Sequence, residues 1–289
     1  MTTLADYRDE RLRKLEEIRA RGIDPYPAKS HRNTKISTIL NHFDEKDGQE
    51  VVVAGRIMAI RSFGKLAFVK IRDYTGEVQI FMEKTDQVED GHFSVKELKL
   101  LDTGDFIEAA GRVGKSSTGE ISAFSNQVRL LTKSLRPLPG HDGFKNKEER
   151  YRRRYVDMNV NPEVRERLVR RSKFWQATRN FMNSKGFIEV NTPVLELTTG
   201  GADATPFTTH MDALDIDYYL RISQELPLKR LLGGGFEKVY DIGPRFRNEG
   251  VDDEHLPEHI AFESYAAYEN YEDGMALYEE MIKYVAKET

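Results

Sequence analysis

The sequence predicts an α+β fold in two parts, an N-terminal five-stranded β-barrel and a following domain with a mainly antiparallel sheet. Short runs of β-favouring residues fill the chain to about residue 131, and near Pro162 the pattern changes to long helices mixed with strands. The 289 residues are enough for two domains, each with its own core. We expect an N-terminal helix and arm at 1–30, the barrel domain at 31–140, a linker at 141–160 and the second domain at 161–289.

Composition excludes several classes of protein. The chain has no cysteine, which excludes disulfides and thiolate zinc sites. No apolar run is long enough to cross a bilayer, and residues 1–22 are charged throughout without an apolar signal core. We therefore expect no membrane partner, no export, and a cytoplasmic location. The net charge of −4 does not indicate nucleic-acid binding, and glutamates among the basic residues of 145–173 favour a solvated surface there.

The first part of the chain predicts one helix and then five strands. Residues 4–21 are expected to form the helix, with apolar residues at roughly helical spacing and Gly22 placed to end it. Five strand-like runs follow, with a short helix after the third: 50–60, 66–72, 77–82, the helix at 94–101, and then 105–113 and 120–131. This order is that of an OB-fold, a small barrel that binds oligonucleotides on one face.

The second part of the chain predicts three helices with strands and turns between them. The helices are expected at 163–184, 225–232 and 272–287. Pro162 suits the first turn of the first helix, and Gly186 is placed to end it. This mixture favours an α+β domain with a mainly antiparallel sheet.

The most informative segment is 239–265, which reads as two antiparallel strands joined by a polar loop at 250–257. Alternation places Arg247 and Glu249 on one face of the first strand. On the return strand it separates a polar set from an apolar set: His259, Glu263 and Tyr265 against Ile260 and Phe262. An ordinary half-buried sheet predicts the same alternation, so the pattern alone is weak evidence for a site.

The chemistry of the polar set is more telling than its spacing. An arginine can stabilise a carboxylate and a phosphate at once while an acyl-adenylate forms, and nearby carboxylates can hold an ammonium. His255, in the loop, could reach nucleotide phosphates, and His259 could stack on a base. Each histidine taken singly is more simply explained as a surface residue.

Two motifs resemble those of class II aminoacyl-tRNA synthetases. Arg247-Asn-Glu249 with its loop and return strand resembles their motif 2, and Lys185–Pro193 resembles motif 1, which builds the dimer interface in that family. Further stretches are similar to lysyl-tRNA synthetases of the bacterial type: Gly22–Pro27, Val53–Met58, Arg136–Pro139, Arg152–Asp157 with Asn161–Arg165, Gly200–Ala202 with Pro206-Phe207, and Glu225–Leu231. The resemblance covers essentially the whole chain, with a partial class II catalytic domain at 161–289.

The resemblance implies roles for named residues in the catalytic part. Arg247 would be the catalytic residue, binding the lysine carboxylate and the α-phosphate of ATP. The remaining ATP contacts would be Glu249 to the adenine amino group, His255 near the phosphates and His259 stacked on the ring, where a phenylalanine is common in the family. The lysine pocket would be lined by Gly201, Glu225, Arg247, Glu263 and Tyr265.

The resemblance also implies an anticodon site on the barrel. Phe68 would stack on an anticodon base, Gln79 and Glu120 would hydrogen-bond base edges, and Arg61 would assist them. Without the resemblance, Phe68 could equally be a residue of the barrel core.

The activity implied is that of a lysine–tRNA ligase, which activates lysine with ATP and transfers it to tRNA(Lys), as a homodimer formed through the motif 1 region. The chain contains no Gly-x-Gly-x-Gly-(Ile/Leu)-Asp-Arg stretch, the usual motif 3. We therefore expect a truncated chain with half a site, no metal ligands of its own, and Mg²⁺ ligands in the missing C-terminal part.

Two alternatives remain open. The chain could bind the tRNA anticodon and dimerise without catalysis, or it could be an aspartyl- or asparaginyl-type synthetase with the same domain order. Glu225, Glu263 and Tyr265 argue against the latter, because an aspartate side chain needs a cationic pocket.

Overall fold

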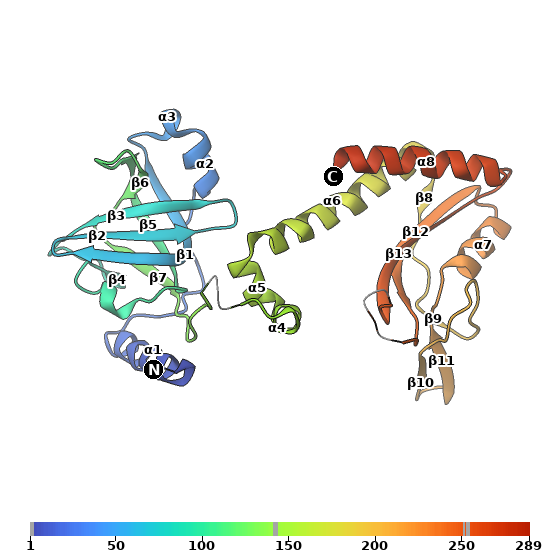
Figure 1. The fold of residues 1–289 in the computed structure, drawn as a ribbon, viewed down its shortest axis with the longest axis horizontal. Coiled ribbons are helices and arrows are strands. Elements are labelled where there is room, and N and C mark those ends of the chain that lie inside the picture. Colours follow the sequence, from blue (N-terminus) through green and yellow to red (C-terminus); the bar gives the residue numbers. More distant parts are fainter. Residues whose placement is uncertain (1–2, 141–143, 251, 253–254) are drawn as a thin grey trace. The chain divides into compact units, whose positions relative to one another are not determined.

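The computed structural model describes residues 3–140, 144–250, 252 and 255–289. The chain forms two compact units, Met1–Asn161 and Pro162–Thr289 (Figure 1). The division falls where the sequence pattern changes. None of the described helices combines the length and the apolar character needed to pass through a membrane.

The first unit is built on a closed five-stranded barrel, as predicted. The strands run in the order β1 (Glu50–Phe63), β2 (Leu66–Arg72), β3 (Glu77–Glu83), β6 (Ile121–Phe124) and β5 (Phe106–Lys115), and β1 pairs with β5 to close the ring. Strand β3 runs parallel to β6, and β7 (Val128–Thr132) and β4 (His92–Phe93) extend the sheet from β5. The alternate residues of the strands that point inward form the barrel core.

Two predicted elements of the barrel differ from the structure. The strand expected at 120–131 is broken into β6 and β7, because the chain turns where the Ser125 hydroxyl donates to the Gln127 carbonyl and accepts from the Gln127 amide. The helix expected at 94–101 is reduced to one 3₁₀ turn, η1 (Leu98–Leu100). It is preceded by a turn in which the Ser94 amide and hydroxyl donate to the Glu97 carboxylate.

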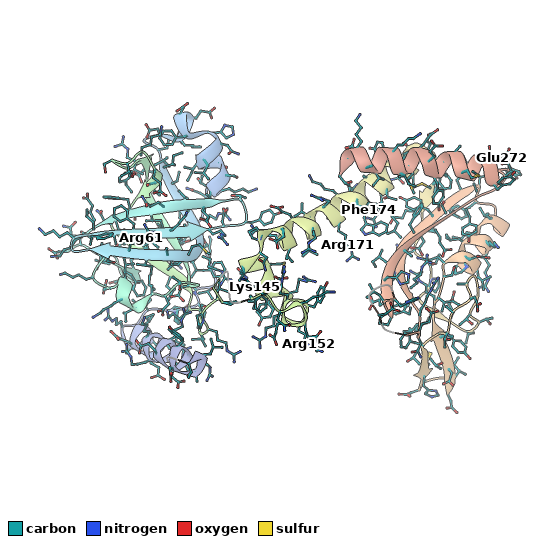
Figure 2. All side chains as sticks on the ribbon, in the orientation of Figure 1. Arg61, Lys145, Arg152, Arg171, Phe174 and Glu272 are labelled. Atoms are coloured by element: carbon teal, nitrogen blue, oxygen red, sulfur yellow. The ribbon has the colours of Figure 1, made fainter. Side chains whose placement is uncertain are left out.

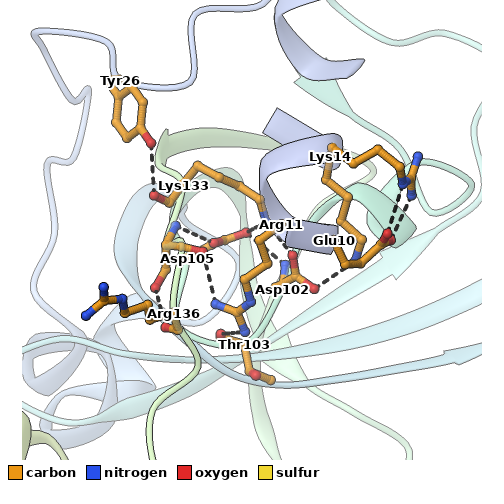
Figure 3. A network of polar contacts seen from close by, with 11 residues as sticks. Glu10, Arg11, Lys14, Tyr26, Asp102, Thr103, Asp105, Lys133 and Arg136 are labelled. Carbon is orange, nitrogen blue, oxygen red and sulfur yellow. Dashed lines mark hydrogen bonds and ion pairs between the residues drawn. The ribbon is translucent and has the colours of Figure 1, made fainter. Parts of the chain in front are cut away.

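A buried charge network attaches helix α1 (Leu4–Ala20) to the barrel (Figure 3). Arg11 donates to the carbonyls of Ser134 at 3.0 Å and Thr103 at 2.9 Å. The Lys133 side chain is fully buried between Asp102 at 2.5 Å and Asp105 at 2.7 Å. Lys14, on α1, reaches the same Asp102 at 2.7 Å. The network therefore joins the start of the chain to the end of the barrel.

Four short helices of the first unit were not expected. Helices α2 (Ile36–Asn41) and α3 (Phe43–Lys46) lie before β1, and Ile36 and Ile39 belong to the barrel core. In the expected linker, 141–143 lie outside the described residues, and most of the remainder forms α4 (Lys147–Arg152) and α5 (Arg154–Val160). The fully buried Asp157 accepts from Arg150, Arg154 and Asn161, so a carboxylate organises this basic stretch.

The second unit places two long helices on one face of a hairpin. The strands are β12 (Lys238–Phe246) and β13 (Glu258–Ala266), with β8 (Ile188–Glu189) parallel to β12. Helices α6 (Pro162–Ser184) and α8 (Tyr271–Glu288) pack on its apolar face, where Met182 and Tyr240 are fully buried. A second sheet contains β9 (Leu195–Glu196), β10 (Thr208–Met211) and β11 (Ile216–Leu220), and α7 (Glu225–Gly233) follows it. The α+β class is confirmed.

Candidate functional site

The β12–β13 hairpin separates polar from apolar side chains by strand alternation. Its register pairs Arg245 with His259, Asp241 with Glu263, and Val239 with Tyr265. Partners opposite each other share a face, so these residues form the polar face of the hairpin. The other face carries Tyr240 and Phe262, which belong to the core under α6 and α8. Arg247 follows β12 in the same alternation, and its amide donates to the Pro257 carbonyl at 3.0 Å.

Arg245 occupies the centre of the polar face, although sequence reasoning did not single it out. Its Nη2 donates to Glu263 Oε1 at 2.9 Å, with both side chains largely buried. The same carboxylate oxygen accepts from Ser223 Oγ at 2.9 Å and from the Gln224 amide at 3.3 Å. Glu263 is thus held in one position by a cation, a hydroxyl and a backbone N–H. The signal that could have found Arg245 is its place two residues before Arg247, on the same side of the strand.

Two arginines on this face have donors without an acceptor. Nε of Arg245 and Nε of Arg247 are both buried, and neither has a hydrogen-bond partner among the described residues. Leaving a buried cationic N–H unpaired is costly, so the pair is suited to an anion with several oxygens, such as a phosphate or a carboxylate. Burial lowers the pKa of His259, and the charges of Arg245 and Arg247 lower it further. The imidazole is consequently neutral near pH 7.

Acidic and phenolic groups gather at the other end of the polar face. Tyr265 Oη donates to Glu263 Oε2 at 3.4 Å and lies near enough to Glu225, at the start of α7, to help lower the pKa of that carboxyl. Burial raises the pKa of Tyr265, and the charges of Glu263 and Glu225 add to this effect. The hydrogen bond from Lys229, at 2.6 Å, lowers the pKa of Glu225. Two carboxylates and a neutral phenol are the groups that a cationic ligand requires.

Gly201 completes this acidic pocket. Its φ is +84°, and a Cβ placed there would lie 2.5 Å from Cβ of Glu225 and 2.8 Å from Oγ of Ser223. Any side chain at this position would therefore collide with the residues that hold Glu263 and Glu225. Of the five residues expected at the lysine pocket, the structure brings four together: Gly201, Glu225, Glu263 and Tyr265. The fifth, Arg247, lies elsewhere on the polar face, beside His259.

The structure shows fewer contacts among the other residues that were predicted to bind ATP. Glu249 is exposed just after β12, and its charge acts on His259, so the two lie near each other. His255 is exposed and pairs with Asp252 at 2.8 Å. Residues 251, 253 and 254 of the predicted polar loop lie outside the described residues. Among the described residues no contact joins His255 to Arg247 or His259.

A buried ion pair supports the hairpin from beneath its polar face. Arg221 Nη1 donates to Asp241 Oδ2 at 3.0 Å and to Thr192 Oγ1 at 2.7 Å, and both charged side chains are almost fully buried. A Cβ at Gly243 would lie 2.1 Å from Nη2 of Arg221, so only glycine leaves room for the guanidinium. Through Arg221, the 185–193 segment and the end of β11 are both joined to β12. Sequence reasoning did not predict this ion pair or the need for glycine at 243.

The barrel carries a row of aromatic rings on its outer face. Register aligns Phe68 of β2 with Phe81 of β3 and Phe124 of β6. Neighbouring ring centroids are 5.2 Å and 5.1 Å apart, and Phe63, 64% exposed, lies 6.0 Å from Phe68. Phe68 is half-buried and lies outside the core cluster. Partly exposed aromatic rings in a row are typical of a platform for unpaired bases.

The other predicted anticodon residues lie on or next to this row. Exposed Arg61 lies opposite Phe68 on β1 (Figure 2). Gln79 donates to Ser122 Oγ at 3.0 Å, and that hydroxyl donates to the carbonyl of exposed Glu120 at 3.1 Å. Sequence reasoning missed Phe81 and Phe124, which the alternation of β3 and β6 with Phe68 could have indicated.

Metal ligands do not gather in the part of the chain that the structure describes. No group of three or more histidine and acidic side chains there is placed to hold a metal ion.

Comparison with protein families and with curated proteins gives matches in both units. Residues 146–289 match the family model described as tRNA synthetases class II (D, K and N), and residues 51–131 match that of the OB-fold nucleic acid binding domain.

Curated relatives named lysine–tRNA ligase align along almost the whole chain. That of Pelotomaculum thermopropionicum is 48% identical over 279 residues, 96% of this chain and 54% of the relative. That of Dehalococcoides mccartyi is 46% identical over 286 residues, 96% of this chain and 57% of the relative. That of Clostridium novyi is 45% identical over 280 residues, 96% of this chain and 54% of the relative. The chain spans about half the length of the curated relatives that it matches.

Proposed function

Because the chain belongs to the class II tRNA synthetases of the D, K and N group and carries an OB-fold nucleic-acid-binding domain, we propose that it serves as a lysine–tRNA ligase. The reaction would activate lysine with ATP to lysyl-adenylate and transfer the lysyl group to tRNA(Lys). In this proposal 31–140 is the anticodon-binding domain and 161–289 is part of the catalytic domain, with 141–160 between them.

The choice of lysine rests on one observation: Glu225, Glu263 and Tyr265 converge around Gly201 at one end of the polar face. A lysine ammonium loses several kcal/mol of hydration on burial and needs such partners. An aspartate or asparagine substrate would instead meet two carboxylates. Arg245, the nearest cation on the polar face, is already paired with Glu263.

Adenylate formation requires the lysine carboxylate to attack the α-phosphorus in line, so catalysis depends on positioning and on stabilisation of charge. In this proposal Arg247 would bind the attacking carboxylate and the α-phosphate together. His259 would stack as a neutral ring on adenine, Glu249 would accept from its amino group, and His255 would approach the phosphates. Mg²⁺ is expected as a partner of ATP in this family.

Partners of the chain follow from the same family. The aromatic row with Arg61, Gln79 and Glu120 would bind the anticodon of tRNA(Lys). A homodimer would form through the motif 1 region, where Ile188 is 52% exposed. Helix α6, just before it, adds the exposed side chains of Leu168 and Phe174. We place this activity in the cytoplasm, where tRNA is charged and where a chain without cysteine is at no disadvantage.

Amino-acid-dependent thermal shifts and pyrophosphate exchange test the proposal. Lysine should raise the melting temperature more than aspartate or asparagine does, and Gly201→Ala should abolish the lysine shift while far-UV circular dichroism stays unchanged. Lysine-dependent exchange between ATP and pyrophosphate would establish activation. A larger shift with aspartate would reject lysine as the substrate.

The second candidate function, an RNA-binding module, is favoured by the completeness of the barrel face. It predicts tRNA binding without any pyrophosphate exchange, even though lysine still shifts the melting temperature. Exchange at a rate that depends on lysine would exclude it.

A further inference from the structure

A cavity of about 820 Å³ lies in the first unit, lined by the start of α1, Arg56 of β1, the segment after β7, and helices α4 and α5. No residue proposed above for lysine, ATP or the anticodon lines it. Four arginines and one glutamate contribute to its wall: Arg8, Arg56, Arg136, Arg153 and Glu149. The wall therefore carries a formal charge of +3, while the whole chain carries −4. Such local excess of positive charge favours an anionic ligand.

Within the described part of the chain, three of the four arginines are in no ion pair. Arg153 pairs with Glu149 at 3.2 Å. Arg8, Arg56 and Arg136 form no ion pair with any carboxylate of the described chain. Arg56 is half-buried, donates to the Gly104 carbonyl at 3.0 Å, and lies over the Phe106 ring at 4.3 Å. These contacts fix the direction of its guanidinium before any ligand binds, which reduces the entropy lost on binding.

The remainder of the wall is largely apolar and includes aromatic rings. Pro137, Leu138 and Val156 face the cavity together with Phe144 and with Tyr155, which is 68% exposed. An inorganic anion would use only the arginines. A nucleotide would use both parts of the wall, since its base stacks on rings and its phosphate accepts from guanidinium groups. The volume also falls within the range of about 300–1,000 Å³ that is usual for small-molecule sites.

We propose that this cavity binds a nucleotide, with the phosphate held by Arg8, Arg56 and Arg136 and the base packed against Tyr155 and Pro137. The nucleotide is either a free mononucleotide or one unit of a bound RNA, because both present the same phosphate and base. The site is separate from the lysine and ATP site of the second unit and does not depend on the function proposed for it.

Calorimetric titration of the full 289-residue chain with AMP and with adenosine tests the site. The variant Arg8→Gln/Arg136→Gln removes two exposed arginines from the wall. Arg19→Gln/Arg152→Gln is its matched control, since it removes the same charge from exposed positions of α1 and α4 that do not line the cavity. Arg247→Gln, titrated in parallel, separates this site from nucleotide binding at the polar face.

We expect AMP to bind the Arg247→Gln variant, and the cavity variant to bind it at least about tenfold more weakly than the control does, since two charge-assisted contacts are lost. Adenosine should bind at least about tenfold more weakly than AMP. Titration of a single-stranded oligonucleotide into the same variants distinguishes a free mononucleotide from a unit of RNA. If AMP does not bind, and only the cavity variant weakens binding of the oligonucleotide, the nucleotide in the cavity is part of an RNA. Two results would overturn the proposal. The first is that the cavity and control variants lose the same affinity for both AMP and the oligonucleotide. The second is that Arg247→Gln alone removes AMP binding while the cavity variant leaves RNA binding unaffected.

Discussion

Arg245 sets the charge balance at the centre of the polar face. It neutralises Glu263 through a direct contact. Burial lowers the pKa of the neighbouring His259 most, and the charges of Arg245 and Arg247 lower it further. The pKa of His259 in the folded protein lies below the value of about 6.5 found in unfolded chains. Protonation therefore favours the unfolded state, and the stability contributed by this group is present above pH 6.5 and lost as the pH falls through the folded pKa.

Replacing Arg245 by glutamine should raise the pKa of His259, because a cation beside the ring is removed while burial remains. Nuclear magnetic resonance titration of the ring protons measures this value directly. Arg179→Gln is a suitable control, since it removes an arginine that pairs with Glu189 away from His259. A His259 pKa that stays constant or falls in Arg245→Gln would show that Arg245 does not act on the ring.

At the scale of single residues, sequence and structure agree where strand alternation governs the result. Alternation predicted the common face of Arg247, His259 and Glu263 because all three lie in or beside one hairpin. It could not bring Gly201 and Glu225 to that face, since their approach depends on contacts between distant segments. Only the resemblance to a known family pointed to them. Ser223, which holds Glu263, carries no signal in the sequence.

Among the elements, the outer strands of the barrel present the aromatic row as one surface. Phe81 lies between Phe68 and Phe124, with both neighbouring rings within van der Waals reach. A base that stacks on this row should contact the central ring, which the resemblance alone did not indicate.

Phe81→Ala should weaken the binding of a tRNA(Lys) anticodon stem-loop by about 1–3 kcal/mol, the usual loss for one stacked base. Fluorescence anisotropy with a labelled stem-loop measures the affinity. Tyr7→Ala, which removes a 48% exposed ring from α1, should leave the affinity unchanged. Equal affinities of Phe81→Ala and the unaltered chain would exclude the row as the RNA platform.

The network between α1 and the barrel depends on Lys133. Burial opposes ionisation of Asp102, but Lys133 and Lys14 together hold its pKa below the usual value, whereas burial raises the pKa of Asp105 despite Lys133. The Asp102 contribution to stability is therefore present above about pH 4 and is lost as the pH falls through its folded pKa.

Lys133→Met should lower the free energy of unfolding by about 3–5 kcal/mol, because it leaves the fully buried carboxylate of Asp105 without its cation and the partly buried Asp102 with Lys14 alone. Urea unfolding followed by circular dichroism gives this value. Adding Asp105→Asn should restore part of the loss, since one of the two charges is then removed. If Lys133→Met unfolds at the same urea concentration as the unaltered chain, the ion pairs contribute nothing to stability.

The predicted elements failed where local side-chain bonding overrode the residue pattern. The hydroxyl of Ser125 turns the backbone inside a run that otherwise reads as one strand. Helices α4 and α5 arise in a segment that reads as a solvated linker, because buried Asp157 collects hydrogen bonds from three residues. Neither long-range burial nor this kind of capping can be read from periodicity.

On the scale of the whole molecule, the two units have separate cores. The barrel core is confined to the first unit, and the core under α6 and α8 is confined to the second. Each unit therefore has its own source of stability, and the only tryptophan, Trp175 of α6, reports on the second unit alone.

Ile80→Ala, a truncation at a fully buried position of the barrel, should destabilise the first unit by about 2–5 kcal/mol. We expect the Trp175 fluorescence transition in urea to stay in place while the circular dichroism signal of the barrel is lost earlier. Leu228→Ala, at a fully buried position of α7, should instead move the fluorescence transition. A single shared transition that Ile80→Ala displaces in both signals would show that the units unfold together.

The unbroken register of the β12–β13 hairpin has a consequence for how its length can vary. Nine residues of each strand pair without a bulge, from Lys238 opposite Ala266 to Phe246 opposite Glu258. Deleting one residue from the middle of β12 would rotate everything beyond it by half a turn, pointing the guanidinium groups into the helices and an aromatic ring into the solvent. A single-residue deletion inside this hairpin should therefore disturb the fold far more than an exchange of one side chain does.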